Sequence, residues 1–125
     1  MGTVNQMIAF DAFTVSWLEG PIETQMKVLS ATLPGASAGL VIEARVTASA
    51  QGSFYFSLIE NSGAATPLTP TMRAINAGQG WASMEATALF EVTESQDVSF
   101  SVLLDKGDLK GDMKIFNLTL IIKAL

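Results

Sequence analysis

Apolar side chains recur at every second residue through most of this chain of 125 residues, and no long stretch shows the 3.6-residue period of an amphipathic helix. The clearest case is Gly39–Ala50, where apolar residues from Leu40 to Ala48 occupy alternate positions and the positions between them include Glu43 and Arg45. A period of two places such side chains on opposite faces of a β-strand. The sequence therefore predicts an all-β protein.

Eight stretches of this character predict the strands of the fold. They are Met7–Trp17, Ile22–Leu33, Gly39–Ala50, Phe54–Ile59, Thr71–Ile75, Ser83–Thr93, Val98–Leu104 and Lys114–Leu125. Between two of them, Gln51-Gly52-Ser53 predicts a short hairpin loop, whereas Glu60–Ser83 is the least regular part of the chain. About eight short strands predict an antiparallel β-sandwich of the jelly-roll type. We expect one domain over residues 1–125, with residues 1–6 as a flexible or anchoring segment.

The final predicted strand, Lys114–Leu125, is apolar on both of its faces. Strict alternation places four apolar side chains on one face: Phe116, Leu118, Leu120 and Ile122. The other face still carries Ile115 and Ile121. A strand face in contact with water is usually polar, so this pattern predicts a central strand whose second face is covered by another subunit. Charged residues make up only 15% of the chain against a usual ~25%, which favours the same interpretation.

The residue types that the sequence lacks disfavour several classes of function. The chain has no histidine and no cysteine, which removes histidine triads, the usual zinc ligands and disulfide frameworks. We therefore expect no enzyme activity, no cofactor and no metal site. Asp105, Asp108 and Asp112 lie in one glycine-containing loop and leave calcium as an open question, although their spacing does not match an EF-hand.

Net charge and hydropathy disfavour two further classes of partner, nucleic acids and membranes. The net charge is −5, and the lysines near the C-terminus alternate with aspartates, so the sequence predicts no nucleic-acid binding. No run of about 18 apolar residues is present, so we expect no membrane insertion. The first eleven residues show no signal-peptide pattern.

The order of these stretches resembles a known family. Gly39–Leu58, Ala86–Leu104 and Ile115–Leu125 carry the likeness, with an F-x-F-x-L strand, an A-L-x-x-V-T strand and an apolar last strand. These three ranges are similar to the trimeric jelly roll of the tumour-necrosis-factor and complement-globular-head type. The same architecture is also found in viral fibre or spike heads. The resemblance implies a homotrimer whose inner sheets meet on a threefold axis. It places the last strand centrally in the inner sheet, beside the first strand and the Phe54–Ile59 strand.

The same resemblance implies which side chains face a neighbouring subunit. They are Phe13, Val15, Trp17, Tyr55, Ser57, Ile59, Leu103, Thr119 and Ile121. The alternative is that loops of the same chain cover these faces. The implied function is a trimeric head on a virion or cell surface, which would bind a glycan or protein receptor through Glu60–Ser83 and Asp105–Asp112. Three weak sites presented together bind more tightly than one.

A second hypothesis is a monomeric carbohydrate-binding sandwich that uses Trp17, Tyr55 or Trp81 as a stacking platform. Trp81 follows a glycine-rich stretch, and three polar side chains close to it in sequence make a ligand contact conceivable: Arg73, Asn76 and Gln79. Aromatic residues and arginine are common in contacts of this kind. The alternative for Trp81 is that it caps the end of the sandwich core.

Overall fold

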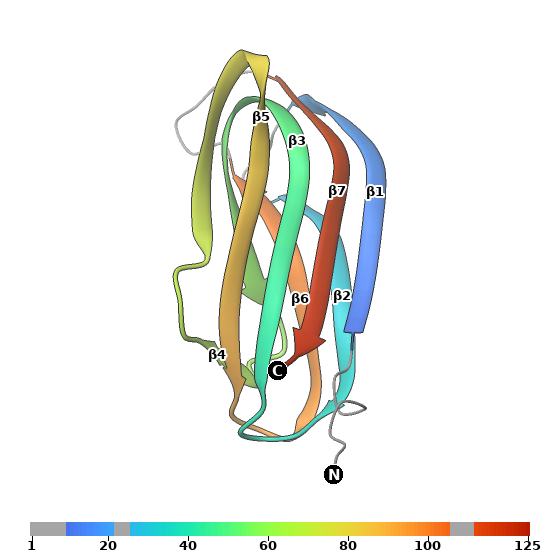
Figure 1. The fold of residues 1–125 in the computed structure, drawn as a ribbon, viewed down its shortest axis with the longest axis vertical. Helices are drawn as coiled ribbons and strands as arrows, with labels where there is room; N and C mark the ends of the chain where they lie inside the picture. The colour runs from blue at the N-terminus through green and yellow to red at the C-terminus, as the bar shows by residue number, and fades with distance from the viewer. Residues whose placement is uncertain (1–9, 22–25, 106–111) are drawn as a thin grey trace.

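The computed structural model describes residues 10–21, 26–105 and 112–125, and these residues form seven strands (Figure 1). The strands are β1 (Phe10–Pro21), β2 (Met26–Ala36), β3 (Val41–Glu60), β4 (Ala65–Pro67), β5 (Met72–Val92), β6 (Gln96–Asp105) and β7 (Asp112–Ala124). All pairings are antiparallel. Within the described ranges no helix is long and apolar enough to cross a membrane. The expected N-terminal segment and most of the aspartate loop, with Asp108, lie outside these ranges.

The strands form two packed layers. The front layer contains β1, β7, the first half of β3 and the second half of β5, with short β4 at its edge (Figure 1). The rear layer contains β2, β6, the second half of β3 and the first half of β5. Apart from β4, each layer therefore holds four strand segments, which correspond in order to the eight predicted stretches. The prediction of an all-β antiparallel sandwich of the jelly-roll type is confirmed.

β3 runs through both layers, and the predicted hairpin at Gln51-Gly52-Ser53 is wrong. A hairpin would pair the two halves of β3 with each other, but both halves pair with β5, which bends beside it (Figure 1). The register shifts on either side of Gly52, whose φ of 118° suits glycine alone. Likewise, β5 starts at Met72 and continues through the glycine-rich stretch that was expected to be irregular.

The core lies between the two layers and is built from large apolar side chains. Phe56, Phe90, Phe100 and Leu120 are almost fully buried. The rings of Phe90 and Phe100 meet edge to face with their centroids 4.9 Å apart. No buried side-chain nitrogen or oxygen among the described residues lacks a hydrogen-bond partner. Burial of each such side chain contributes about 1.5–3 kcal/mol, so the two layers are held together mainly by apolar contact.

A bulge in β7 reverses the prediction of which side chains before Asn117 point into the core. Asn117 has a φ of 54° and is the only described non-glycine residue with positive φ. Thr119 pairs with Thr47, but two residues further along β3 Ser49 pairs with Phe116, three residues back along β7, so β7 contains one extra residue here. Strict alternation predicted Phe116 inward and Ile115 outward. The structure shows the opposite, because the left-handed residue shifts the alternation by one position: Ile115 is buried and Phe116 is exposed.

A carboxylate orders the turn after β3. The Glu60 side chain accepts hydrogen bonds from the hydroxyl and N–H of Ser62 and from the N–H of Gly63 at 2.7 Å. Burial alone would raise the pKa of Glu60. The hydrogen bonds from Ser62, together with backbone N–H groups of Gly63 and Ser99, favour the ionised form and lower the pKa below its usual 4.5.

Replacing this carboxylate should make folding less sensitive to acid. Because the pKa of Glu60 is lower in the folded state, its stabilisation is fully present above pH 4.5 and is lost as the pH falls through the folded-state value. At pH 6 we expect Glu60→Gln to lower the free energy of unfolding by about 0.5–1 kcal/mol, because the side chain is only partly buried. Urea unfolding at pH 6 and pH 3 measures the difference, which should shrink at pH 3. An equal loss at both pH values would contradict the role of the charge.

Candidate interaction surfaces

Three large aromatic side chains meet on the outer face of the front layer. Trp17 on β1, Trp81 on β5 and Phe116 on β7 remain 46%, 52% and 46% exposed. The Trp17 ring centroid lies 6.2 Å from that of Trp81 and 6.2 Å from that of Phe116. Trp17 Nε1 also donates a hydrogen bond of 3.2 Å to Glu19. We call Trp17, Ser49, Trp81 and Phe116 the aromatic surface.

A small side chain at the centre gives the aromatic surface its shape. Ser49 on β3 pairs with Phe116 on one side and with Ser83 on the other. Because serine does not fill the space between the larger rings, a hollow of about 320 Å³ remains, lined by Trp17, Ser49, Trp81 and Phe116. The arrangement can accept an apolar group flat against aromatic rings.

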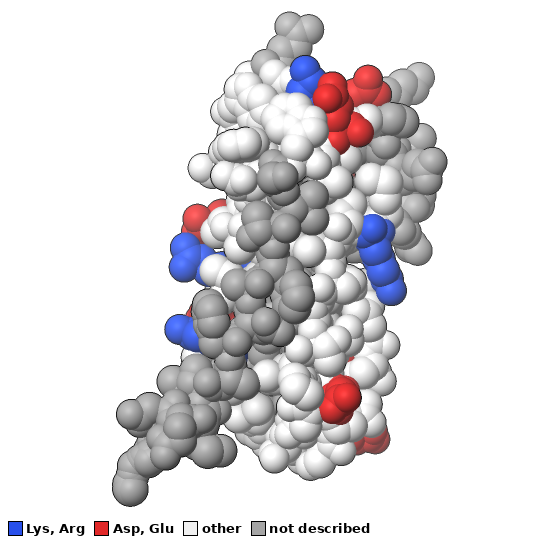
Figure 2. Space-filling model, turned by 90° about the vertical axis from the view of Figure 1, so that its right-hand side faces the viewer, with Lys and Arg blue, Asp and Glu red and all other residues white. Residues whose placement is uncertain are grey.

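The rest of the outer front face is mixed in character. Ile121 and Thr119 on β7 are partly buried, and Arg45 on β3 is exposed beside them. Near the other end Lys123 lies 3.9 Å from the carboxylate of Glu43. Figure 2, which shows the side formed by β1 and β2, likewise shows scattered charges of both signs among the described residues.

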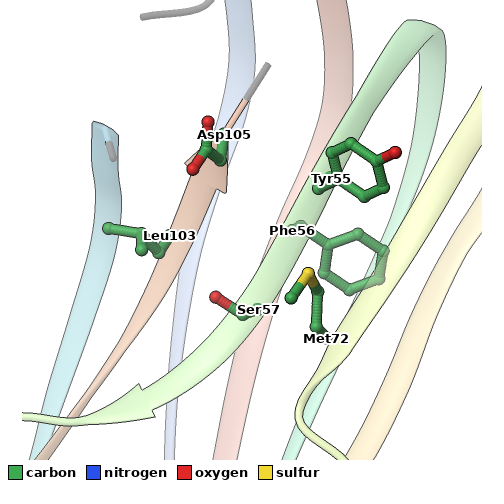
Figure 3. Close-up of a pocket in the computed structure, with 6 residues that line it drawn as sticks. All are labelled: Tyr55, Phe56, Ser57, Met72, Leu103 and Asp105. Carbon is green, nitrogen blue, oxygen red and sulfur yellow. The ribbon is translucent and has the colours of Figure 1, made fainter. Parts of the chain in front are cut away.

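A second hollow lies on the outer face of the rear layer. The residues that line it include Leu103 and Asp105 on β6, Tyr55 and Ser57 on β3, and Met72 on β5 (Figure 3). Its volume is about 210 Å³. Tyr55 is 37% and Met72 60% exposed. We call these five residues the rear hollow.

The structure divides the predicted subunit interface between two opposite faces. Trp17, Thr119 and Ile121 belong to the front layer. The other described side chains of the set belong to the rear layer: Tyr55, Ser57, Ile59 and Leu103. The prediction that the last strand lies beside the Phe54–Ile59 strand is wrong. β3 changes layers at Gly52, and the first half of β3 is the part that pairs with β7.

Two further residues of that set, Phe13 and Val15, are placed only by their backbone. Their backbones pair with Leu120 and Leu118 of β7. The structure does not describe their side chains. Phe116 and Ser49 were missed by the sequence analysis, because strict alternation placed Phe116 in the core. The asparagine in the middle of an apolar strand was the available signal, since Asn adopts positive φ more readily than most residues.

The predicted ligand contacts around Trp81 are only partly brought together. Trp81 is half exposed on the front layer and does not cap the core, so that alternative is wrong. Arg73 and Asn76 pair with Phe56 and Ser53 in the rear layer. The structure does not describe the side chains of Arg73, Asn76 and Gln79. No group of three or more acidic side chains within the described ranges could hold a metal ion.

Comparison with known proteins identifies the fold. No protein-family model matches the chain, and no curated protein matches it. Among solved structures the chain is similar to one from the "Structure of the tripod (BppUct-A-L) from the baseplate of bacteriophage Tuc2009", with a TM-score of 0.62 and 13% sequence identity. The similarity covers 96% of this chain and 64% of that chain. At this level of identity the likeness establishes a shared β-sandwich fold.

Proposed function

We propose that this protein is a non-enzymatic attachment or structural module of a virion or cell surface that assembles with itself as a homotrimer. Its action would be binding and presentation, with three copies held together so that weak contacts act jointly. The subunits would meet through the outer face of the front layer. The aromatic surface would lie in that interface.

The observation that carries this proposal is the contact between three half-exposed aromatic side chains. Isolated exposed apolar residues are common on soluble proteins, but a contiguous group of them marks an interaction site. Aromatic residues are enriched in the buried centres of protein interfaces, and charged residues are depleted there. Trp17, Trp81 and Phe116 come from three different strands, so a partner pressed against them would bury parts of β1, β5 and β7 together.

Two further findings support the proposal. The trimeric heads that the sequence resembles turn the layer with the last strand toward the threefold axis, and in this chain that layer carries the aromatic surface. The fold is also shared with a chain of a phage baseplate tripod, which favours a role on a virion. Tyr55, Ser57, Ile59 and Leu103 lie on the other layer and are not part of the proposed interface.

Light scattering on the purified chain tests the assembly. We expect a mass of about three times 13.2 kDa at micromolar concentration. Small-angle scattering of the same sample should give a particle with a threefold arrangement of sandwiches. A single-chain mass over the whole concentration range would contradict the trimer.

A second candidate function is a monomeric carbohydrate-binding module that uses the hollow of the aromatic surface as a stacking platform. The half-exposed rings around Ser49 favour it, because they could receive the apolar face of a sugar. A single-chain mass together with glycan binding that depends on Trp81 would support this alternative. A trimer in which the aromatic surface is protected from solvent would contradict it.

A further inference from the structure

We propose that the rear hollow is a binding site for a neutral sugar unit, a glucose, galactose or N-acetylhexosamine residue of a surface polysaccharide. This site lies on the layer opposite the aromatic surface and is distinct from the proposed subunit interface. It does not depend on how many copies assemble.

The shape of the rear hollow follows from the register of three strands. Leu103 on β6, Ser57 on β3 and Met72 on β5 lie in one row across the layer. The central member is short and its neighbours are long, so a depression forms above Ser57. Its floor is hydrogen-bonded strand, which makes the site largely preformed, and preformed sites lose less freedom when a ligand binds.

The neighbouring row supplies the polar groups. Asp105, Tyr55 and Ala74 are opposite one another on β6, β3 and β5. Asp105 on β6 and Tyr55 on β3 both line the hollow (Figure 3). The site thus combines apolar walls from Leu103 and Met72 with a carboxylate and two hydroxyl groups.

This combination matches the chemistry of a sugar ring. A pyranose offers a face of C–H groups that can lie against an aromatic or thioether side chain. Its edge carries hydroxyl groups, which donate hydrogen bonds to a carboxylate and exchange them with the hydroxyls of Ser57 and Tyr55.

Charge decides which sugars fit. Asp105 places a negative group in the wall of the hollow, and the chain as a whole carries a net charge of −5. An anionic sugar, such as a sialic or uronic acid, would be repelled by this carboxylate. The hollow of the aromatic surface differs, because none of the residues that line it is acidic. The rear hollow is therefore the better site for a hydroxyl-rich neutral ligand.

The position of the site also suits multivalent binding. Tyr55 and Met72 lie on the outer face of the rear layer, away from the aromatic surface. If subunits meet through the front layer, as proposed above, each trimer presents three rear hollows outward. Weak binding to single sugars would then become tight binding to a repeating polysaccharide.

Ligand-observed NMR on the full chain tests the site. The probes are the methyl glycosides of glucose, galactose and N-acetylglucosamine, with methyl glucuronide and methyl sialoside as anionic comparisons. At least one neutral glycoside should bind, in the millimolar range expected for one small ligand, and the anionic ones should bind at least tenfold more weakly. Ser57→Leu fills the hollow and Tyr55→Ala removes the ring, and each should weaken binding at least tenfold.

Trp81→Ser on the front layer is the matched control, and its affinity per chain should stay within twofold of the original. Circular dichroism shows that each variant is folded, and light scattering reports assembly separately. Binding that is retained in a monomeric Trp81→Ser variant supports the site independently of the trimer. Absence of binding by every neutral glycoside, or unchanged binding in folded Ser57→Leu, would overturn the proposal. Loss of binding with Trp81→Ser alone would place the sugar on the aromatic surface and overturn it as well.

Discussion

Replacing Gly52 by alanine is expected to lower the free energy of unfolding by about 2–4 kcal/mol, because strain and a steric clash act together. Gly52 has a φ of 118°, which L-residues rarely adopt. A Cβ atom there would also lie 2.8 Å from the backbone oxygen of Asp112 and 3.3 Å from the Cα of Met113. β7 cannot easily move away, because it is hydrogen-bonded to β1 on one side and β3 on the other. Urea denaturation measures the loss.

Gly39→Ala is the matched control for this prediction. Gly39 also has positive φ, at 92°, but a Cβ atom there would meet nothing within 4 Å. It should therefore cost only the backbone strain, about 1 kcal/mol. If the two variants lose the same stability, the contact with Asp112 is not the cause of the larger effect.

A lysine in the centre of the front face is expected to abolish assembly. Ile121 on β7 is half-buried on the outer face of the front layer, paired with Arg45 of β3. Ile121→Lys would bury a positive charge without a partner in the proposed interface, next to an arginine of the same sign. We expect association to weaken at least a hundredfold, about 3 kcal/mol or more. Light scattering over a range of concentrations should show single chains that remain folded.

Ile59→Lys provides the comparison on the opposite layer. Ile59 is half-buried on β3 and pairs with Ser101 of β6, on the outer face of the rear layer. This variant should assemble like the original chain. Dissociation by Ile59→Lys with normal assembly of Ile121→Lys would place the interface on the rear layer and contradict the proposal.

The fold class followed from the sequence because a period of two residues is a local property. The stretches that became β3, β5 and β6 all show it, and their inward side chains are those predicted, such as Ile42, Phe90 and Phe100. The order of the stretches was also sufficient to suggest a jelly roll. Both features can be read from residues close together in the chain. They are kept in the folded protein because burial of the whole apolar face of a strand stabilises the fold most.

The sites were harder to predict because they depend on the placement of strands in space. Gly52 was interpreted as a hairpin, since a glycine between two apolar runs usually marks a turn. In the structure it lets one strand serve both layers, which separates Tyr55 and Ser57 from Trp17. One left-handed residue, Asn117, was enough to move Phe116 from the core to the surface. The rear hollow combines residues from three strands, and no local pattern could show that they share a row.

The position of β7 has a consequence for the order in which the molecule is made. β7 lies between β1 and β3, so the front layer cannot be completed before Asp112–Ala124 has been synthesised. Contacts between segments so distant in sequence also slow folding. The aromatic surface needs Phe116 together with Trp17 and Trp81, and it therefore cannot form before Phe116 has been synthesised.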